Sequence, residues 1–145
     1  MSNFTTISGS IDSNDKQVPL GTEVWIDDTC IINVEHVDQI IHFSHELTDE
    51  DGEHELRIVM KNKTSEHTDV NEDGKIVRDA RLIINDIKFD EVKLTYNQLI
   101  KIIYKHDFNG SAEEIEDQFY EELGCNGTAS LKFTTPTYLW LLENQ

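Results

Sequence analysis

The sequence predicts a mainly β protein, built as an antiparallel β-sandwich of the jelly-roll type. Short runs rich in Val, Ile, Thr and aromatic residues recur along the chain, and turn signals separate them about every ten residues. Helical periodicity is clear in one segment only. At 145 residues the chain lies in the size range of a single domain and is long enough to bury a core.

A single sandwich domain is expected over residues 21–145. Residues 1–20 are rich in Ser, Asn, Asp and Gly with scattered apolar positions. We therefore expect an extended N-terminal arm there, one that packs against something or stays loose. An arm of this kind is suited to docking on a neighbouring subunit.

Two hairpins are predicted in the first half of the domain. Thr22–Ile26 and Cys30–Val34 have β-type composition, and the two aspartates between them supply turn chemistry. Gln39–Ser44 is followed by an acidic Asp-Gly segment, Asp49–Gly52, and then by Glu55–Met60, where apolar residues alternate with polar ones. This order predicts the second hairpin.

The remaining strands are predicted from the same alternation of apolar and polar residues. In Arg81–Phe89 the apolar parity changes at residues 85–86, which predicts a β-bulge or a break. Asn97–Tyr104 fits either a helical face or a strand, and both alternatives stay open. Ala129–Thr134 and Tyr138–Leu142 are predicted as the last two strands.

One short amphipathic helix is predicted over about Ser111–Leu123. Ser111 and Glu114 match a capping box, and acidic residues in the first turn suit the helix dipole. Apolar residues recur at every fourth position: Ile115, Phe119 and Leu123.

The charge balance restricts the classes of partner. Twelve basic and 29 acidic residues give a net charge of −17, which would repel nucleic acid and anionic membranes. No apolar run approaches the roughly 18 residues that a membrane span needs, and the N-terminus lacks a secretory pattern. We expect a protein made in a cytoplasm, with Cys30 and Cys125 as buried free thiols.

The connection between the strands Glu55–Met60 and Arg81–Phe89 contains the pattern D-x-N-x-D-G. Oxygen ligands at alternate positions followed by a glycine are typical of calcium loops. An EF-hand is excluded, because its twelfth position is Ala80 and the flanks are strand-like. The alternative is a hairpin turn whose acids are simply exposed. The candidate calcium ligands are Asp69, Asn71, Asp73, Lys75 through its backbone carbonyl, and Asp79.

No catalytic or nucleotide-binding motif is found, so we expect a protein that is not an enzyme. The chain lacks G-x-S-x-G, HExxH, G-x-G-x-x-G and the P-loop pattern. Aromatic side chains are the remaining candidates, because sugar-binding modules stack them on pyranose rings. Trp25 and Trp140 lie in apolar runs and favour the core instead. The aromatic candidates are Trp25, Tyr96, Tyr104, Tyr120, Tyr138 and Trp140.

Three stretches carry a resemblance: HELRIVMKNKTSEHTDVNEDGKIVRDARLIINDIKFDEV, YKHDFNG and LGCNGTASLKFTTPTYLWLLEN. Over residues 22–144 the chain resembles small proteins of tailed phages, especially those of marine and cyanobacterial hosts. The H-E-L-x-I pattern with its strand pair also resembles carbohydrate-binding modules with a β-sandwich fold, some of which hold calcium.

The resemblance implies a virion protein that acts by binding. We expect a tail, fibre or baseplate component that contacts other virion proteins in multiple copies, or a host-surface glycan. One alternative is a capsid decoration protein that clasps the shell through the arm of residues 1–20. Another is a free, calcium-dependent, lectin-like protein.

Overall fold

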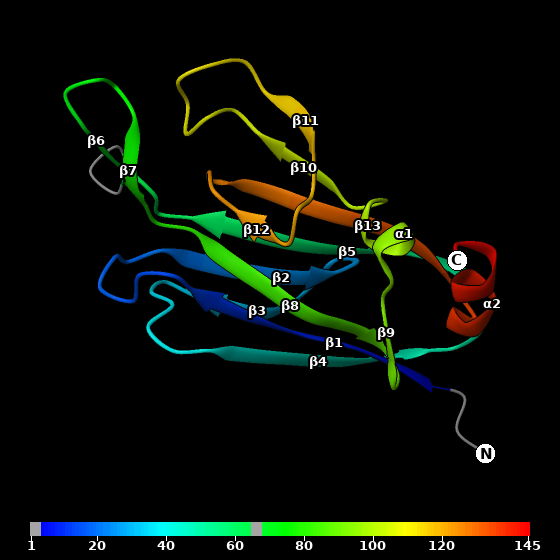
Figure 1. Cartoon of the computed structure of the whole chain (residues 1–145). Coiled ribbons are helices and arrows are strands. Elements are labelled where there is room, and N and C mark those ends of the chain that lie inside the picture. Colours follow the sequence, from blue (N-terminus) through cyan, green and yellow to red (C-terminus); the bar gives the residue numbers. More distant parts are fainter. Residues whose placement is uncertain (1–3, 65–67) are drawn as a thin grey trace.

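The computed structural model describes residues 4–64 and 68–145 and shows two antiparallel sheets stacked face to face (Figure 1). The prediction of a mainly β antiparallel sandwich is confirmed. The jelly-roll order of the strands stays a prediction. In the described part of the chain, neither helix has the length and apolar character needed to cross a membrane.

Sheet A has the order β12-β8-β1-β4, with β9 pairing on β8. Its strands are β1 (Phe4–Ser13), β4 (Ile41–Thr48), β8 (Leu82–Phe89), β9 (Val92–Lys93) and β12 (Glu122–Leu123). Sheet B has the order β11-β10-β13-β5-β2-β3. Its strands are β2 (Gly21–Ile26), β3 (Thr29–Val34), β5 (Gly52–Lys61), β10 (Ile103–His106), β11 (Ile115–Gln118) and β13 (Gly127–Thr135).

Three further elements lie outside the two sheets. A separate two-stranded hairpin consists of β6 (Thr68–Val70) and β7 (Ile76–Asp79). The helices are short: α1 (Tyr96–Leu99) follows β9, and α2 (Thr137–Glu143) follows β13. Figure 1 places the β6–β7 hairpin at one end of the sandwich and both helices toward the other.

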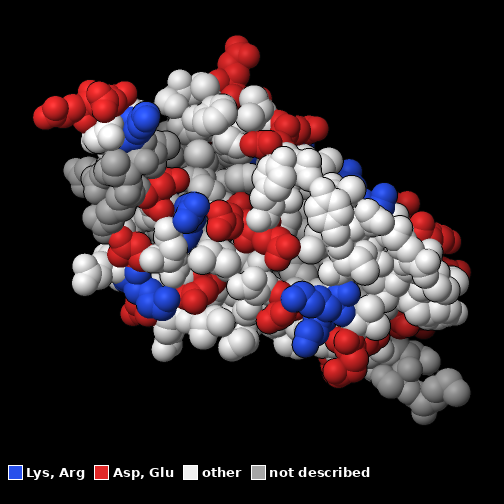
Figure 2. All heavy atoms as spheres, viewed as in Figure 1, with Lys and Arg blue, Asp and Glu red and all other residues white. Residues whose placement is uncertain are grey.

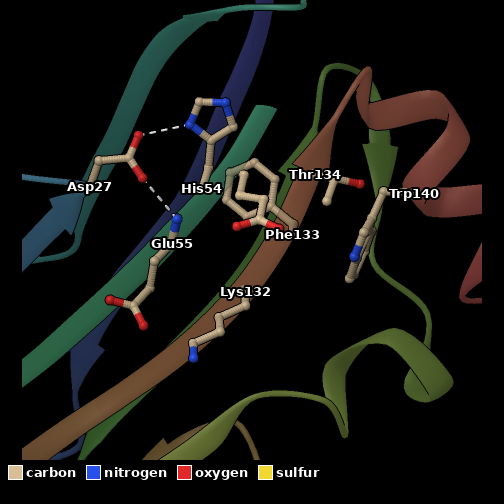
Figure 3. Close-up of a pocket in the computed structure, with 8 residues that line it drawn as sticks. Asp27, His54, Glu55, Lys132, Phe133, Thr134 and Trp140 are labelled. Atoms are coloured by element: carbon tan, nitrogen blue, oxygen red, sulfur yellow. Dashed lines mark hydrogen bonds and ion pairs between the residues drawn. The ribbon is translucent and has the colours of Figure 1, made fainter. Parts of the chain in front are cut away.

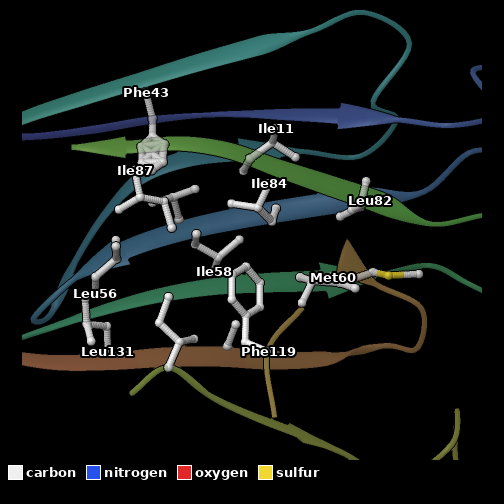
Figure 4. Close-up of a cluster of buried hydrophobic side chains, with 14 of the residues drawn as sticks. Ile11, Phe43, Leu56, Ile58, Met60, Leu82, Ile84, Ile87, Phe119 and Leu131 are labelled. Atoms are coloured by element: carbon white, nitrogen blue, oxygen red, sulfur yellow. The ribbon is translucent and has the colours of Figure 1, made fainter. Parts of the chain in front are cut away.

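The core lies between the two sheets (Figure 4). Sheet A contributes Ile11, Phe43 and Ile84, and sheet B contributes residues such as Ile58 and Leu131, all at most 2% exposed. In β5, Leu56, Ile58 and Met60 are buried while their neighbours are half-buried, as the alternating pattern predicts.

The predicted N-terminal arm is wrong for residues 4–13. They form β1, an interior strand of sheet A that pairs with β4 on one side and β8 on the other. Thr5, Ile7, Gly9 and Ile11 all face inward. This alternation is present in the sequence, but small polar residues make it weak, because Ser, Thr and Gly lower the mean hydropathy of a strand without preventing its burial.

The first predicted hairpin is confirmed and the second is wrong. β2 and β3 pair directly. β4 belongs to sheet A, however, whereas β5 belongs to sheet B, where it pairs with β2 and β13. The segment Asp49–Gly52 is therefore a corner that crosses between sheets. A local turn signal predicts that the chain reverses direction, but it does not predict which sheet the next strand joins.

The bulge predicted at residues 85–86 is confirmed. Between the pairs Ser8–Lys88 and Ser10–Asn85, the single residue Gly9 of β1 is opposite two residues of β8, Asp86 and Ile87. Asp86 takes a left-handed φ of 56°, which lets Ile84 and Ile87 both face the core.

The helix predicted over Ser111–Leu123 is wrong. Ile115–Gln118 forms the exposed edge strand β11, and Glu122–Leu123 forms the short strand β12. Six acidic residues lie in this segment, and in a helix their like charges would repel one another at i, i+3 and i+4 spacing. As a strand, β11 instead pairs with the backbone of β10, where Nζ of Lys105 lies 3.7 Å from Glu116. Tertiary pairing therefore outweighs the local helical signal.

The structure also decides the secondary structure of two further segments, Asn97–Tyr104 and Tyr138–Leu142. Asn97–Tyr104 contains both alternatives, since α1 covers its start and β10 its end. Tyr138–Leu142 is not a strand but lies within α2. Pro136 lacks the N–H that a continuing ladder needs, and the helix begins at the next residue.

Candidate functional site

The D-x-N-x-D-G segment forms the turn of the β6–β7 hairpin. Gly74 has a φ of 78°, and the Asn71 N–H donates to the Lys75 carbonyl over 2.8 Å. The side-chain oxygen of Asn71 accepts hydrogen bonds from the N–H groups of Asp73 and Lys75, each 3.0 Å away. Both lone pairs of this oxygen are thereby used within the turn. The geometry is that of the hairpin alternative.

The other candidate ligands lie apart from this turn. Asp79 ends β7 at the base of the hairpin, where its Oδ1 lies 2.5 Å from Nζ of the buried Lys63. That ammonium also donates to the Gly124 carbonyl at 2.5 Å, so Lys63 fastens the hairpin to the sandwich. The side chain of Asp69 is outside the described part of the structure.

The structure thus brings Asn71, Asp73 and Lys75 into one turn and leaves Asp79 at its base. Asp73 and Lys75 are exposed. Over residues 4–64 and 68–145, no three His, Cys, Asp or Glu side chains are described as grouped to hold a metal ion. Calcium binding by the loop stays a prediction.

A hollow of about 590 Å³ opens beside His54, between Asp27 and Trp140 (Figure 3). His54 Nδ1 lies 2.7 Å from Asp27 Oδ2, and its Nε2 lies 3.2 Å from the hydroxyl of Thr135. The second carboxylate oxygen of Asp27 accepts the Glu55 N–H over 2.9 Å. A carboxylate, an imidazole and a hydroxyl are therefore linked in a row by hydrogen bonds, in the spatial order found in catalytic triads.

The direction of the hydrogen bonds indicates that this network stabilises the fold by joining neighbouring segments. The Thr135 hydroxyl donates its one proton to the Glu50 carbonyl, so this proton is not directed at His54 Nε2. Thr135 is also only 4% exposed. The chain of Asp27, His54 and Thr135 ties the β2–β3 turn and the end of β13 to the corner between β4 and β5.

The aromatic candidates divide into buried and exposed groups. Trp140 and Tyr104 are each 6% exposed, so Trp140 lies in the core as predicted. Trp25 does not: it is half-buried on the outer side of β2, with the Arg57 guanidinium 5.4 Å above its ring. That cation covers one face of the ring. The exposed candidates are Tyr96, Tyr120 and Tyr138.

Two of these exposed tyrosines belong to an uncharged surface formed by the β9–α1 segment and α2. A groove of about 630 Å³ runs between them, lined by apolar and amide side chains. Tyr96, Leu142 and Tyr138 are 70%, 60% and 59% exposed. We define the α1–α2 surface as Val92, Thr95, Tyr96, Asn97, Ile100, Tyr138, Leu141, Leu142 and Gln145.

This surface stands on a fixed base. The buried Gln98 accepts the Thr95 N–H over 2.8 Å and donates to the Leu141 carbonyl over 3.1 Å, which joins α1 to α2. Beneath α2, the Trp140 ring lies 5.4 Å from that of Phe89. The first turn of α2 is held through the Thr137 N–H, which donates to Asp49 over 3.0 Å. The exposed apolar side chains are therefore presented by an ordered element.

The charge distribution sets this surface apart. None of its nine side chains is charged, although Tyr96 and Ile100 also line a hollow with Glu116 and Asp117, and the exposed Glu143 lies at the end of α2. In Figure 2 a broad white area covers the side where Figure 1 shows α1 and α2, and both acidic and basic groups lie along its borders. Exposed apolar groups collected in one charge-free area are typical of a protein contact.

The two cysteines are free and differ in exposure. Cys30 is exposed on the edge strand β3, which corrects the prediction of burial. Cys125 is half-buried, and desolvation raises the pKa of its thiol. Its carbonyl accepts the Tyr104 hydroxyl, and its N–H donates to the same oxygen over 2.8 Å. Neither cysteine lies on the α1–α2 surface.

No protein-family model matches the chain, and no curated protein or solved structure is detectably similar to it. The α1–α2 surface was also not predicted from the sequence. Tyr96 and Tyr138 were singled out, but as separate sugar-stacking candidates. The available signal was the uncharged run Tyr138–Leu142, which becomes informative once it is recognised as a helix with only Trp140 deeply buried.

Proposed function

We propose that the chain is a non-enzymatic binding module that acts by surface complementarity in the assembly of a phage particle, as a tail, fibre or baseplate component. The observation that carries the proposal is the α1–α2 surface, which is apolar, uncharged and held rigidly on an otherwise acidic molecule. Such a surface gains free energy when another protein covers it.

The phage setting rests on a different observation. It is the resemblance of residues 22–144 to small proteins of tailed phages, and on this ground we propose that the partners are other virion proteins. The module then works as a scaffold, with its two packed sheets holding α1 and α2 in a fixed relation. The three groups Asp27, His54 and Thr135 support binding rather than catalysis, because their hydrogen bonds point away from nucleophile activation.

The structure does not favour the capsid-decoration alternative, which depends on an extended N-terminal arm. That alternative needs a free arm to clasp the shell, whereas residues 4–13 are hydrogen-bonded between β4 and β8. The lectin-like alternative depends on the calcium loop, and on aromatic faces of which only Tyr96, Tyr120 and Tyr138 are widely exposed.

The test is incorporation into particles. Mass spectrometry of purified virions should find the chain in fixed stoichiometry with the tail proteins. A phage that carries Tyr138→Glu should assemble particles lacking it, because a carboxylate buried in an apolar contact has no partner. The matched control is Val70→Glu, the same change of charge on a β6 side chain that is 59% exposed. Absence of the wild-type chain from purified particles would refute the proposal.

A further inference from the structure

We infer that Asn109 is a site of self-modification, at which the folded chain converts this asparagine to aspartate and isoaspartate with water as the co-reactant. The inference goes beyond the proposed function and does not depend on the α1–α2 surface. It starts from the dipeptide Asn-Gly, which occurs at Asn109-Gly110 and at Asn126-Gly127. Because glycine has no side chain, its backbone nitrogen can approach the side-chain carbonyl carbon of the preceding asparagine.

The conversion consists of a ring closure and a hydrolysis. The Gly110 nitrogen loses its proton and attacks Cγ of Asn109. The side-chain amide nitrogen takes up a proton and leaves as ammonia, which closes a succinimide ring. Water then opens the ring, at Cγ to give aspartate or at the main-chain carbonyl to give isoaspartate, and no atom is oxidised or reduced. Since the attacking and attacked groups belong to neighbouring residues, the ring closure is intramolecular.

The attacking nitrogen is placed against a base. The Gly110 N–H donates to the Asp107 carboxylate, with 2.8 Å between the nitrogen and Oδ1, and the Asp107 carbonyl oxygen lies 3.2 Å from the same nitrogen. A general base must lie about 2.6–3.2 Å from the atom whose proton it takes. Asp107 Oδ1 meets this condition, so it can take the proton from Gly110 and return it to the leaving nitrogen.

The attacked carbonyl is held at its oxygen. Asn109 Oδ1 accepts the backbone N–H of Asn126 over 2.7 Å. Negative charge develops on this oxygen when the nitrogen attacks Cγ, and a hydrogen-bond donor fixed at that position stabilises the charge. The turn therefore supplies both a base for the nucleophile and a donor for the developing charge.

The turn is also open to water and strained. Asn109 and Gly110 are exposed. Phe108, Asn109 and Gly110 have φ values of 56°, 60° and 88°. A left-handed φ is unfavourable for the two residues that carry a Cβ. A change of the backbone at this turn can therefore release strain, and water can reach the succinimide.

The second dipeptide is held in a different way and provides an internal control. The Asn126 side-chain amide donates to the Lys63 carbonyl over 2.8 Å and accepts the Lys63 N–H over 2.9 Å. Gly127 belongs to β13, whose backbone pairs with β5 on one side and β10 on the other. Its nitrogen cannot turn toward the Asn126 side chain without leaving the sheet. We therefore expect little conversion at Asn126 while the chain is folded.

The test is a time course of the full chain at neutral pH, followed by mass spectrometry of its peptides. Cleavage after the glutamates between residues 113 and 122 puts the two asparagines on separate peptides. Conversion at Asn109 should be at least about tenfold faster than at Asn126, whose side chain must first break two hydrogen bonds. Labelling by an isoaspartyl methyltransferase should appear at residue 109. In urea the two rates should become similar, because both dipeptides then lose their contacts.

Asp107→Asn tests the base. The amide oxygen can still accept the Gly110 N–H but cannot take its proton, so conversion at Asn109 in the folded variant should fall at least about tenfold. In urea the variant should react as fast as the wild type, which separates loss of the base from a change of local sequence. Thermal unfolding shows whether the variant folds, and the comparison of folded and unfolded wild-type chain does not depend on it.

Two results would overturn the inference. One is a folded wild-type chain that converts Asn109 no faster than Asn126. The other is a folded Asp107→Asn variant that converts Asn109 as fast as the wild type does.

Discussion

At the scale of single residues, the tightest constraint lies where two strands meet at Gly127. A Cβ placed there would stand 2.2 Å from the Lys105 carbonyl oxygen and 2.8 Å from the Cβ of His106. The backbone of β10 cannot withdraw without breaking its pairing with β13. Gly127 is thus required by a close approach of two backbones.

We expect Gly127→Ala to reduce the free energy of unfolding by about 1–3 kcal/mol, the usual effect of a forced backbone shift. Denaturant unfolding measures it. Gly124→Ala is the matched control, because its Cβ would meet Asp79 Oδ2 at an ordinary 3.9 Å. Equal unfolding midpoints for the two variants would show that β10 and β13 are not held as closely as described.

Tyr104 predicts a loss of stability at alkaline pH. Burial raises the pKa of its phenol above the ordinary value of 10.0. The folded state therefore favours the protonated form, and this contribution is complete below pH 10 and declines as the pH rises above that value. Tyr104→Phe should flatten this part of the stability profile, measured by urea unfolding at increasing pH.

The same substitution should cost about 1–3 kcal/mol at neutral pH, because the Cys125 N–H and carbonyl lose their shared partner. Tyr96→Phe is the control, since its side chain is 70% exposed. A Tyr104→Phe profile that falls as steeply as the wild type would mean that other groups govern alkaline unfolding.

At the scale of elements, the sequence predicts those strands whose apolar residues alternate strongly, and fails where local and tertiary signals compete. β5 and β8 were recognisable because their inward positions are Leu, Ile, Met and Phe, and even the bulge in β8 followed from the shift in parity. β1 was missed because its inward positions include Thr5 and Gly9. The false helix at Ser111–Leu123 had sound local capping chemistry, but pairing with β10 determined the structure.

The β6–β7 hairpin tests the calcium prediction. In it Asn71 already satisfies two backbone N–H groups, so binding requires exchange of those bonds for a metal ligand. We expect weak binding, seen as a small rise of the melting temperature in Ca²⁺ over chelator. Mg²⁺ at equal ionic strength is the necessary control, because any divalent cation screens a chain of charge −17.

Asp73→Asn should abolish the difference between Ca²⁺ and Mg²⁺, since it removes one of the predicted carboxylate ligands while Asp73 makes no described side-chain contact that holds the fold. Equal melting temperatures of the wild-type chain in excess calcium and in excess chelator would reject the calcium loop. The segment would then be a hairpin turn whose acids serve solubility.

At the scale of the whole molecule, the candidate site joins parts of the chain that the sequence keeps apart. Val92, Tyr96 and Tyr138 come from β9, α1 and α2, and they share one surface only because Gln98 links the two helices and Trp140 anchors α2. Composition reported the excess of acid but not its placement. The grouping of uncharged side chains on one face is therefore visible only in three dimensions.

The excess of acidic residues predicts how salt affects the stability of the chain. Self-repulsion among 29 acids opposes the compact state, so the free energy of unfolding should rise as ionic strength increases from about 0.01 M to about 0.15 M. KCl and NaCl should act equally, since the effect is screening. A stability independent of salt would mean that ion pairs such as Lys61 with Glu23 and Glu35 offset the repulsion locally.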